Sequence, residues 1–244
     1  IYNPNVFEPK VLREILIKEK IDDVVLPFGL YYAITRQPFA KNELNLNTPL
    51  CGGEPTPYMP TKDVNEKLQS SGSSRIIIGT GSTEFGSGIM ASYGIEERNN
   101  ESGYFFPYSK GFLLDPNTGE KITEPGKRGI LYANAPWQME GYLNDQDATN
   151  EFFNYKDSSG TVCGTNNDVA EIVGEHNGQP VFSMMGRASD FILSTNKKTY
   201  FPGVELKNGM VQKVDFEKGN FMFELRDILL NIEGVMEVQP IIVP

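Results

Sequence analysis

The sequence has little of the chemistry on which many enzymes and metal proteins depend. Its 244 residues include one histidine, His176, and two cysteines, Cys51 and Cys163. The histidine lies in the turn-like residues 174–180, so we expect a solvent-exposed hairpin position and no His-dependent hydrolase or transferase site. The cysteines lie far apart without metal-ligand spacing, so we expect two free thiols. Zinc sites of the Cys/His type are excluded by count.

Dense positive charge and long apolar runs are also missing. The net charge is −10, and no cluster of Lys or Arg could follow a phosphate backbone, so nucleic acid and anionic membranes are not expected partners. No apolar stretch approaches the roughly 18 residues that a membrane span needs, and the first residues show no charged-then-apolar signal pattern. We therefore expect a cytoplasmic protein without a membrane span.

Patterns in the first hundred residues predict an α/β arrangement. A helical pattern over residues 8–20 is followed by a short buried strand at 24–26. Two further apolar segments, 44–50 and 76–78, each end in glycine, the second abruptly at Gly79, with a helical pattern between them. Strands joined through a helix are parallel neighbours, so both glycine tips should meet at one edge of a sheet.

The sequence pattern changes after residue 102, where short segments rich in strand-forming residues alternate with clusters of turn residues. We expect three parts. Residues 1–102 form a parallel sheet with flanking helices, residues 103–189 an antiparallel, barrel-like β subdomain, and residues 190–244 the start of a small α+β domain.

The polar tip that follows the strand at 76–78 carries residues suited to a phosphate group. Thr83 offers a hydroxyl to a phosphate oxygen, and Glu84 offers a hard carboxylate suited to Mg²⁺. The neighbouring glycines would let a flat ring or a phosphate approach the backbone. A Ser-Thr-Glu tripeptide beside glycines is more often an ordinary turn or a helix N-cap, however. Only motifs further along the chain favour the nucleotide interpretation.

Five motifs, taken in order, resemble those of the adenylate-forming superfamily, which includes acyl-CoA synthetases, peptide-synthetase adenylation domains and luciferases. The matching segments are 79–84, 115–120 with 125–131, 141–144 with 148–152, 166–168 and 186–192. In such enzymes ATP and a carboxylic acid give an acyl-adenylate and pyrophosphate, and a thiol, usually coenzyme A or a carrier pantetheine, then takes the acyl group. The resemblance implies ATP or AMP, Mg²⁺ and coenzyme A as ligands. It also implies the large domain of an acyl-CoA synthetase-like fold, followed by part of the small one.

The resemblance also implies roles for individual residues. Thr83 would bind the α-phosphate, and Glu84 the Mg²⁺. Asp168 would accept both ribose hydroxyls, and Arg187 would donate to the ribose or a phosphate. Asp190 would be the hinge about which the small domain rotates between the two half-reactions. The remaining residues of the expected nucleotide site are Gly52, Gly53 and Glu54 along the adenine, with Gly79, Thr80 and Gly81.

The sequence departs from the family pattern at several points. Thr80 replaces the aromatic residue that usually stacks on adenine, a contact worth very roughly 1 kcal/mol. Asn167 replaces the Gly before Asp168, and asparagine tolerates positive φ better than most residues. Residues 200–220 read as an insertion. The family's phosphate loop and C-terminal lysine find no match, so we expect a piece of a longer protein that adenylates nothing efficiently by itself.

Two functions stay open, and they belong to different classes. The leading hypothesis is an AMP-forming acyl-CoA synthetase acting on a small-molecule carboxylic acid. The acid pocket would run behind residues 79–81, and coenzyme A or a carrier-protein pantetheine would be the acceptor. The alternative is a catalytically inactive nucleotide-binding or scaffold domain derived from the same fold. An unrelated α/β protein with coincidental motifs is a third possibility. Residues 87–90 indicate only that the acid pocket tolerates an apolar group.

Overall fold

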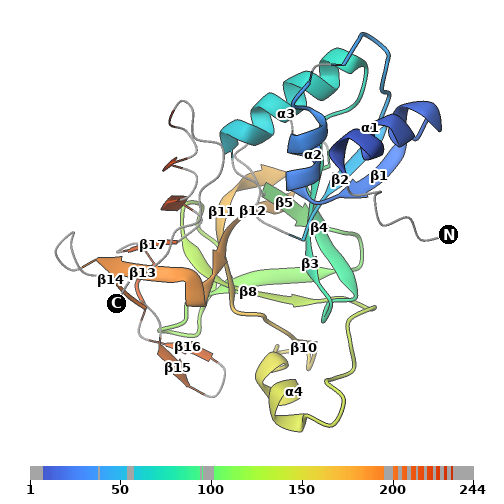
Figure 1. Cartoon of the computed structure of the whole chain (residues 1–244). Coiled ribbons are helices and arrows are strands. Elements are labelled where there is room, and N and C mark those ends of the chain that lie inside the picture. The colour runs from blue at the N-terminus through green and yellow to red at the C-terminus, as the bar shows by residue number, and fades with distance from the viewer. Residues whose placement is uncertain are drawn as a thin grey trace.

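A computed structural model describes residues 8–37, 39–53, 58–93, 95, 102–194 and short stretches of the C-terminal part, namely 200–202, 205–207, 210–212, 214–216, 219–221, 224–225, 228–229 and 232. Within these ranges the helices are α1 (Pro9–Lys18), α2 (Phe28–Ile34), α3 (Tyr58–Ser71) and α4 (Gln146–Phe152), with a 3₁₀ turn η2 (Ala188–Asp190). Figure 1 shows α1, α2 and α3 gathered at one end of the molecule, beside β1 and β2.

The strands of the first half are β1 (Asp23–Leu26), β2 (Thr48–Cys51), β3 (Ile77–Ser82), β4 (Ser87–Ala91), β5 (Ser102–Phe105), β6 (Lys110–Leu114), β7 (Lys121–Ile122) and β8 (Arg128–Asn134). Those of the second half are β9 (Tyr155–Lys156), β10 (Val162–Cys163), β11 (Asp168–His176), β12 (Gln179–Arg187), β13 (Phe191–Ser194), β14 (Tyr200–Pro202), β15 (Glu205–Lys207), β16 (Met210–Gln212) and β17 (Gly219–Phe221).

Ten strands form one sheet in the order β1-β2-β3-β4-β5-β12-β11-β8-β6-β7. The pairs β1–β2 and β2–β3 are parallel, and α3 lies between β2 and β3 in the chain, as the sequence predicts. Every other pair in the sheet is antiparallel. The predicted α/β fold class is therefore confirmed, and the antiparallel strands extend the parallel ones within the same sheet.

The central strand differs from its prediction. The strand does not stop where the apolar run ends before Gly79, because β3 continues to Ser82 and pairs antiparallel with β4. Gly79 and Gly81 take extended conformations whose hydrogen bonds go to β4, after the parallel pairing with β2 has ended at Ile78. The expectation of an abrupt stop was thus wrong. Backbone pairing with β4 keeps these glycines in the strand although glycine has a low β propensity.

A buried tyrosine joins α2 to the parallel strands. Tyr31 is fully buried, and its hydroxyl lies within hydrogen-bond reach of the carbonyl oxygens of Val24 in β1, at 3.1 Å, and Leu50 in β2, at 3.0 Å. Burial, with a smaller contribution from Cys51, raises the pKa of Tyr31, so the phenol stays a donor. The helix is therefore tied to both parallel strands through this one side chain.

The antiparallel strands and the C-terminal strands share a second packing region. Phe191 of β13 and Phe221 of β17 are fully buried, with ring centroids 5.1 Å apart, and both contact Phe216. The segment predicted as an insertion, 200–220, supplies β14 and β17 on either side of β13, with β15 and β16 as a separate pair. The predicted domain limits at 102 and 190 fall at the start of β5 and in η2, and they stay predictions.

The histidine and the cysteines lie mostly as expected. His176 ends β11 at a tight hairpin, since Asn177 and Gly178 both have positive φ. It is half-buried and not solvent-exposed, because its ring stacks on Tyr104 with centroids 4.9 Å apart. Both cysteines are buried, and neither forms a disulfide. Within the described ranges, every helix falls short of the length and hydropathy that crossing a membrane requires.

Candidate functional site

A cavity of about 280 Å³ opens where β2, β3, β11 and β12 bring their ends together. Its lining residues are Gly53, Ile78, Gly79, Thr80, Gly81, Asp168, Met184, Gly186, Arg187 and Asp190. It therefore lies at the carboxyl ends of the parallel strands, the place where open α/β sheets bind ligands. Small-molecule sites span roughly 300–1,000 Å³, so this open cavity lies just below the size range of such sites.

Two glycines after β2 bring the strand ends close together. A Cβ at Gly52 would stand 2.9 Å from the carbonyl oxygen of Gly79, so glycine there lets β2 and β3 approach each other. Gly53 has φ of 86° and lines the cavity itself. Gly52 thus shapes the cavity without being among its lining residues, and Glu54, the third residue predicted along the adenine, lies outside the described residues.

The glycines of β3 keep one wall of the cavity free of side chains. A Cβ at Gly81 would stand 1.7 Å from the carbonyl oxygen of Ser87, so only glycine lets β3 and β4 pair at this point. Gly79 has more room, because its nearest neighbour would be the Cys51 carbonyl oxygen at 3.6 Å. Between them Thr80 is half-buried and lines the cavity. The wall therefore offers backbone polar groups and one hydroxyl.

Asp168 and Arg187 face each other across the first rung of the β11–β12 pair. The Arg187 Nε lies 3.6 Å from Asp168 Oδ1, with 63% of the arginine side chain and 28% of the aspartate side chain exposed. Burial raises the pKa of Asp168, with smaller rises from Glu84 and Asp190, and the guanidinium offsets only part of this. Asn167, at φ of 58°, provides the backbone turn that presents the carboxylate.

Glu84 lies in the turn between β3 and β4, close to this pair. Its Oε1 accepts a hydrogen bond of 2.8 Å from the Tyr142 hydroxyl. Burial alone would raise the pKa of Glu84, but contacts with Ser82, with its own backbone amide and with Tyr142, together with a nearby guanidinium, hold that pKa below its ordinary value. The buried Ser82 hydroxyl has no well-formed hydrogen bond among the described residues. The carboxylate is therefore ionised and half-buried at neutral pH.

The predicted site residues are thus brought together in part. Gly53, Thr80 and Asp168 line one cavity, although they come from three distant parts of the chain. Glu84 is close enough for its charge to raise the pKa of Asp168 and for the Arg187 guanidinium to lower the pKa of Glu84, but Glu84 does not line the cavity. Thr83 is exposed in the turn and is also not a lining residue.

Sequence reasoning missed several contributors. Gly186, at φ of 119°, lines the cavity beside Arg187, and the glycine in its motif was the available signal. Met184 also lines it, and no sequence pattern marks an apolar strand residue for that role. Tyr142 lies in a matched motif, but its contact with Glu84 spans 58 residues and could not be read from spacing.

The residues present fit a nucleotide and a single divalent cation. Glycine backbone suits the close approach of a ring or phosphate, and a carboxylate has two oxygens for neighbouring hydroxyls. Among the described residues, no group of three or more His, Cys, Asp or Glu could hold a metal ion alone. Mg²⁺ bound with a nucleotide usually takes only one or two protein carboxylates, so Glu84 is sufficient for that kind of site.

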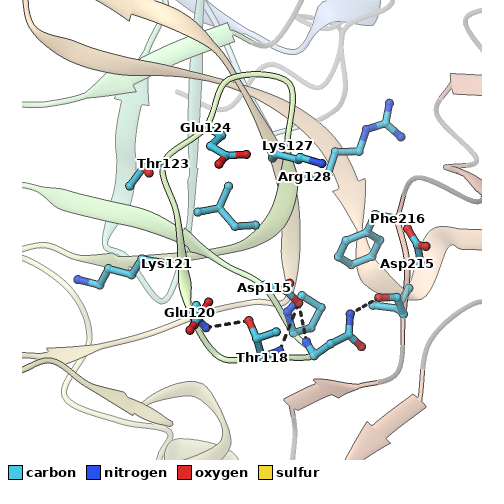
Figure 2. A pocket seen from close by; sticks show the side chains of 14 residues that line it. Asp115, Thr118, Glu120, Lys121, Thr123, Glu124, Lys127, Arg128, Asp215 and Phe216 are labelled. Carbon is cyan, nitrogen blue, oxygen red and sulfur yellow. Dashed lines mark hydrogen bonds between the residues drawn. The ribbon is translucent and has the colours of Figure 1, made fainter.

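A second cavity, of about 480 Å³, belongs to a different part of the molecule. Figure 2 shows its walls: the loops before and after β7, which carry the matched segments 115–120 and 125–131, and the C-terminal residues Asp215 and Phe216. Asn117 Nδ2 donates to the Val214 carbonyl oxygen at 2.5 Å. These motifs therefore contact the C-terminal segment and contribute nothing to the cavity that Asp168 lines.

The sequence has recognisable relatives among plant CoA ligases. It is 35% identical over 114 residues to peroxisomal OPC-8:0-CoA ligase 1 of Arabidopsis thaliana, covering 45% of this chain and 20% of that protein. It is 27% identical over 150 residues to 4-coumarate–CoA ligase-like 9 of the same plant, covering 59% of this chain and 26% of that protein. The chain thus spans about a fifth to a quarter of these relatives. No family model matches it.

Solved structures share the fold over nearly the whole chain. The anthranilate CoA ligase AuaEII in complex with anthranoyl-AMP superposes with a TM-score of 0.71 at 14% identity, covering 97% of this chain and 39% of that one. ATP-bound MatB from Rhodopseudomonas palustris gives 0.67 at 15% identity, covering 94% and 39%. The sequence relatives and the shared fold together support the resemblance to the adenylate-forming, AMP-binding superfamily.

Proposed function

We propose that the chain supplies the nucleotide site of an AMP-forming acid–thiol ligase, most closely an acyl-CoA synthetase. The observation that carries the proposal is the cavity in which Gly53, the β3 glycines and Asp168 meet. The curated relatives are CoA ligases, and the fold neighbours include one holding anthranoyl-AMP and one holding ATP. The acid is a small-molecule carboxylic acid, and the acceptor is coenzyme A or a carrier-protein pantetheine.

Each residue has a role that follows from its chemistry. The Asp168 carboxylate accepts hydrogen bonds from the ribose hydroxyls, and the exposed Arg187 guanidinium donates to the ribose or a phosphate oxygen. Backbone groups of the β3 wall lie against the base, where Thr80 offers a hydroxyl and no aromatic face. Thr83 donates to the α-phosphate from the exposed turn, and Asp190 acts as the hinge of the small domain.

The reaction needs donors and positive charge more than a protein nucleophile. A carboxylate oxygen attacks the α-phosphorus, pyrophosphate leaves, and negative charge builds on the equatorial phosphate oxygens. Mg²⁺, when bound, supplies charge that neutralises these oxygens. Glu84 would hold this cation with a carboxylate that its lowered pKa keeps ionised. The thiol then attacks the acyl carbon, the acyl–phosphate bond breaks, and AMP leaves while the thiol proton passes to solvent.

Thr80 favours a second candidate, a nucleotide-binding or scaffold domain without catalysis, because no aromatic ring stacks on the base at this position. Exchange of radioactive pyrophosphate into ATP, measured with the protein that carries this chain across a panel of carboxylic acids, separates the two. The ligase requires acid-dependent exchange. Binding of AMP without exchange for any acid would favour the scaffold instead. The cytoplasmic location expected from the sequence is part of the proposal and stays untested.

A further inference from the structure

The segment from 135 to 153 holds the turn that carries Glu84 at several points. The backbone amide of Met139 donates to the Glu84 carbonyl oxygen at 2.8 Å. The Trp137 indole donates to the Gly88 carbonyl oxygen at 3.3 Å, and a Cβ at Gly86 would stand 2.3 Å from the Trp137 carbonyl oxygen. The turn is therefore fixed by this segment from outside its own hairpin.

Tyr142 is the one residue of this segment that bonds the Glu84 side chain, and its own backbone is tightly held. Its amide donates to the Thr149 hydroxyl at 2.9 Å, and that hydroxyl donates in turn to the Asp145 carbonyl oxygen at 2.8 Å. A Cβ at Gly141 would stand 2.9 Å from the Thr149 side chain, so glycine allows this contact. The motif segments 141–144 and 148–152 thus form one unit that presents the Tyr142 ring.

Burial does not account for this arrangement. The tip of the loop is exposed, with 39% of Tyr142 and 91% of the adjacent Leu143 accessible to solvent. Polar contacts at such a position add little to the free energy of folding, because water competes for them. What they do fix is the orientation of a half-buried carboxylate. A carboxylate has about four lone-pair sites, and Tyr142 occupies one of them at 2.8 Å.

We propose that Tyr142 is a positioning residue for the divalent cation: by holding one oxygen of Glu84, it aims the other at the cation of a bound metal–nucleotide complex. This inference rests on the proposed function, in which Glu84 binds the cation. A tyrosine hydroxyl is an O–H donor at neutral pH, so it can hold an ionised carboxylate oxygen. Groups that orient a metal ligand typically change metal affinity about 10–100-fold when removed.

The test is calorimetric titration of the chain with AMP, with and without saturating Mn²⁺ as a stand-in for Mg²⁺. The ratio of the two AMP dissociation constants measures the coupling between cation and nucleotide. In Tyr142→Phe we expect the coupling to fall about tenfold or more. If the wild-type coupling is itself less than about tenfold, we expect it to vanish in this variant. The metal-free AMP affinity and the melting temperature should not change. Tyr108→Phe, which removes a hydroxyl from a tyrosine that is 83% exposed, serves as the matched control.

Two outcomes would overturn the inference. Wild-type coupling in Tyr142→Phe would show that the hydroxyl does not position the ligand. A fall in metal-free affinity and melting temperature together would show that Tyr142 only stabilises its loop. Glu84→Gln distinguishes these failures from failure of the proposed function. If Glu84→Gln keeps the coupling, the cation does not bind at Glu84, whereas loss of coupling in Glu84→Gln alone contradicts only the role given to Tyr142.

Discussion

Replacing Asp168 by asparagine should separate binding from stability. The substitution keeps the shape of the side chain but removes the charge that accepts the ribose hydroxyls in the proposed site. Hydrogen bonds to a charged group contribute about 1.5–3 kcal/mol, so we expect AMP affinity to fall roughly 10–150-fold. The contact with Arg187 is lost as well, but at 3.6 Å, with 63% of the arginine exposed, it adds at most about 1 kcal/mol to stability.

The same substitution should make the folded chain more stable at neutral pH. Burial raises the pKa of Asp168 above the value of about 3.9 that an unfolded chain gives it. Between those two values the folded chain binds more protons than the unfolded one, so stability falls as the pH rises through this window. Asp168→Asn removes the ionisable group and with it this loss of stability. Removing a destabilising group from a functional site typically raises the free energy of unfolding by about 0.5–2 kcal/mol, which corresponds to about 1–8 °C in melting temperature.

Calorimetric titration with AMP and thermal unfolding between pH 4 and 8 together test this prediction. The gain in melting temperature should be smallest near pH 4 and should reach a plateau above the folded pKa of Asp168. Asp22→Asn, at an exposed carboxylate before β1, is the control for loss of one negative charge. Unchanged AMP affinity would refute the ribose role. A loss of stability at pH 7 would refute the conclusion that burial outweighs the arginine.

Four further substitutions test the packing of the folded chain. Gly81→Ala should lower the free energy of unfolding in urea by about 3 kcal/mol or more, because the new Cβ would stand 1.7 Å from a carbonyl oxygen. Gly79→Ala should change it by less than about 1 kcal/mol, because the nearest atom to the new Cβ would be 3.6 Å away. Arg128→Met removes the cation that contacts both Glu171 and Glu224, and hydrogen exchange should become faster in residues 214–224 with a stability loss of about 1–3 kcal/mol. Phe152→Ala should lower stability by about 3–5 kcal/mol, since the ring is 4% exposed; a loss below about 1 kcal/mol would contradict its core position.

The parallel strands and their shared edge could be predicted from the sequence because both depend on local pattern. Apolar runs that end in glycine placed β2 and β3, and the helical pattern between them required parallel pairing. The continuation of β3 to Ser82 could not be predicted, because Gly79 and Gly81 carry no pattern, and their pairing with β4 decides the conformation. The short helix α2 was overlooked for a similar reason: its seven residues give only two helical turns.

The sequence predicts the residues of the candidate site that line the cavity directly. It does not predict those that contribute through contact with a residue far away in the chain. Asp168 follows a turn residue with positive φ, and its motif placed it at the cavity. The link between Tyr142 and Glu84 depends on the docking of a separate segment, which no spacing reveals. Gly52 is predicted to lie along the adenine, and what the structure shows is that its lack of a side chain allows β2 to approach β3.

The central claim, that ends of distant strands meet to bind an adenine nucleotide, is tested most directly by following backbone amide NMR signals while AMP is added. The account predicts saturable shifts concentrated at the lining residues Gly53, Gly79, Gly81, Asp168 and Gly186. It would be contradicted if saturating AMP left these signals in place, or if the shifts concentrated instead around the second cavity, at residues 115–128.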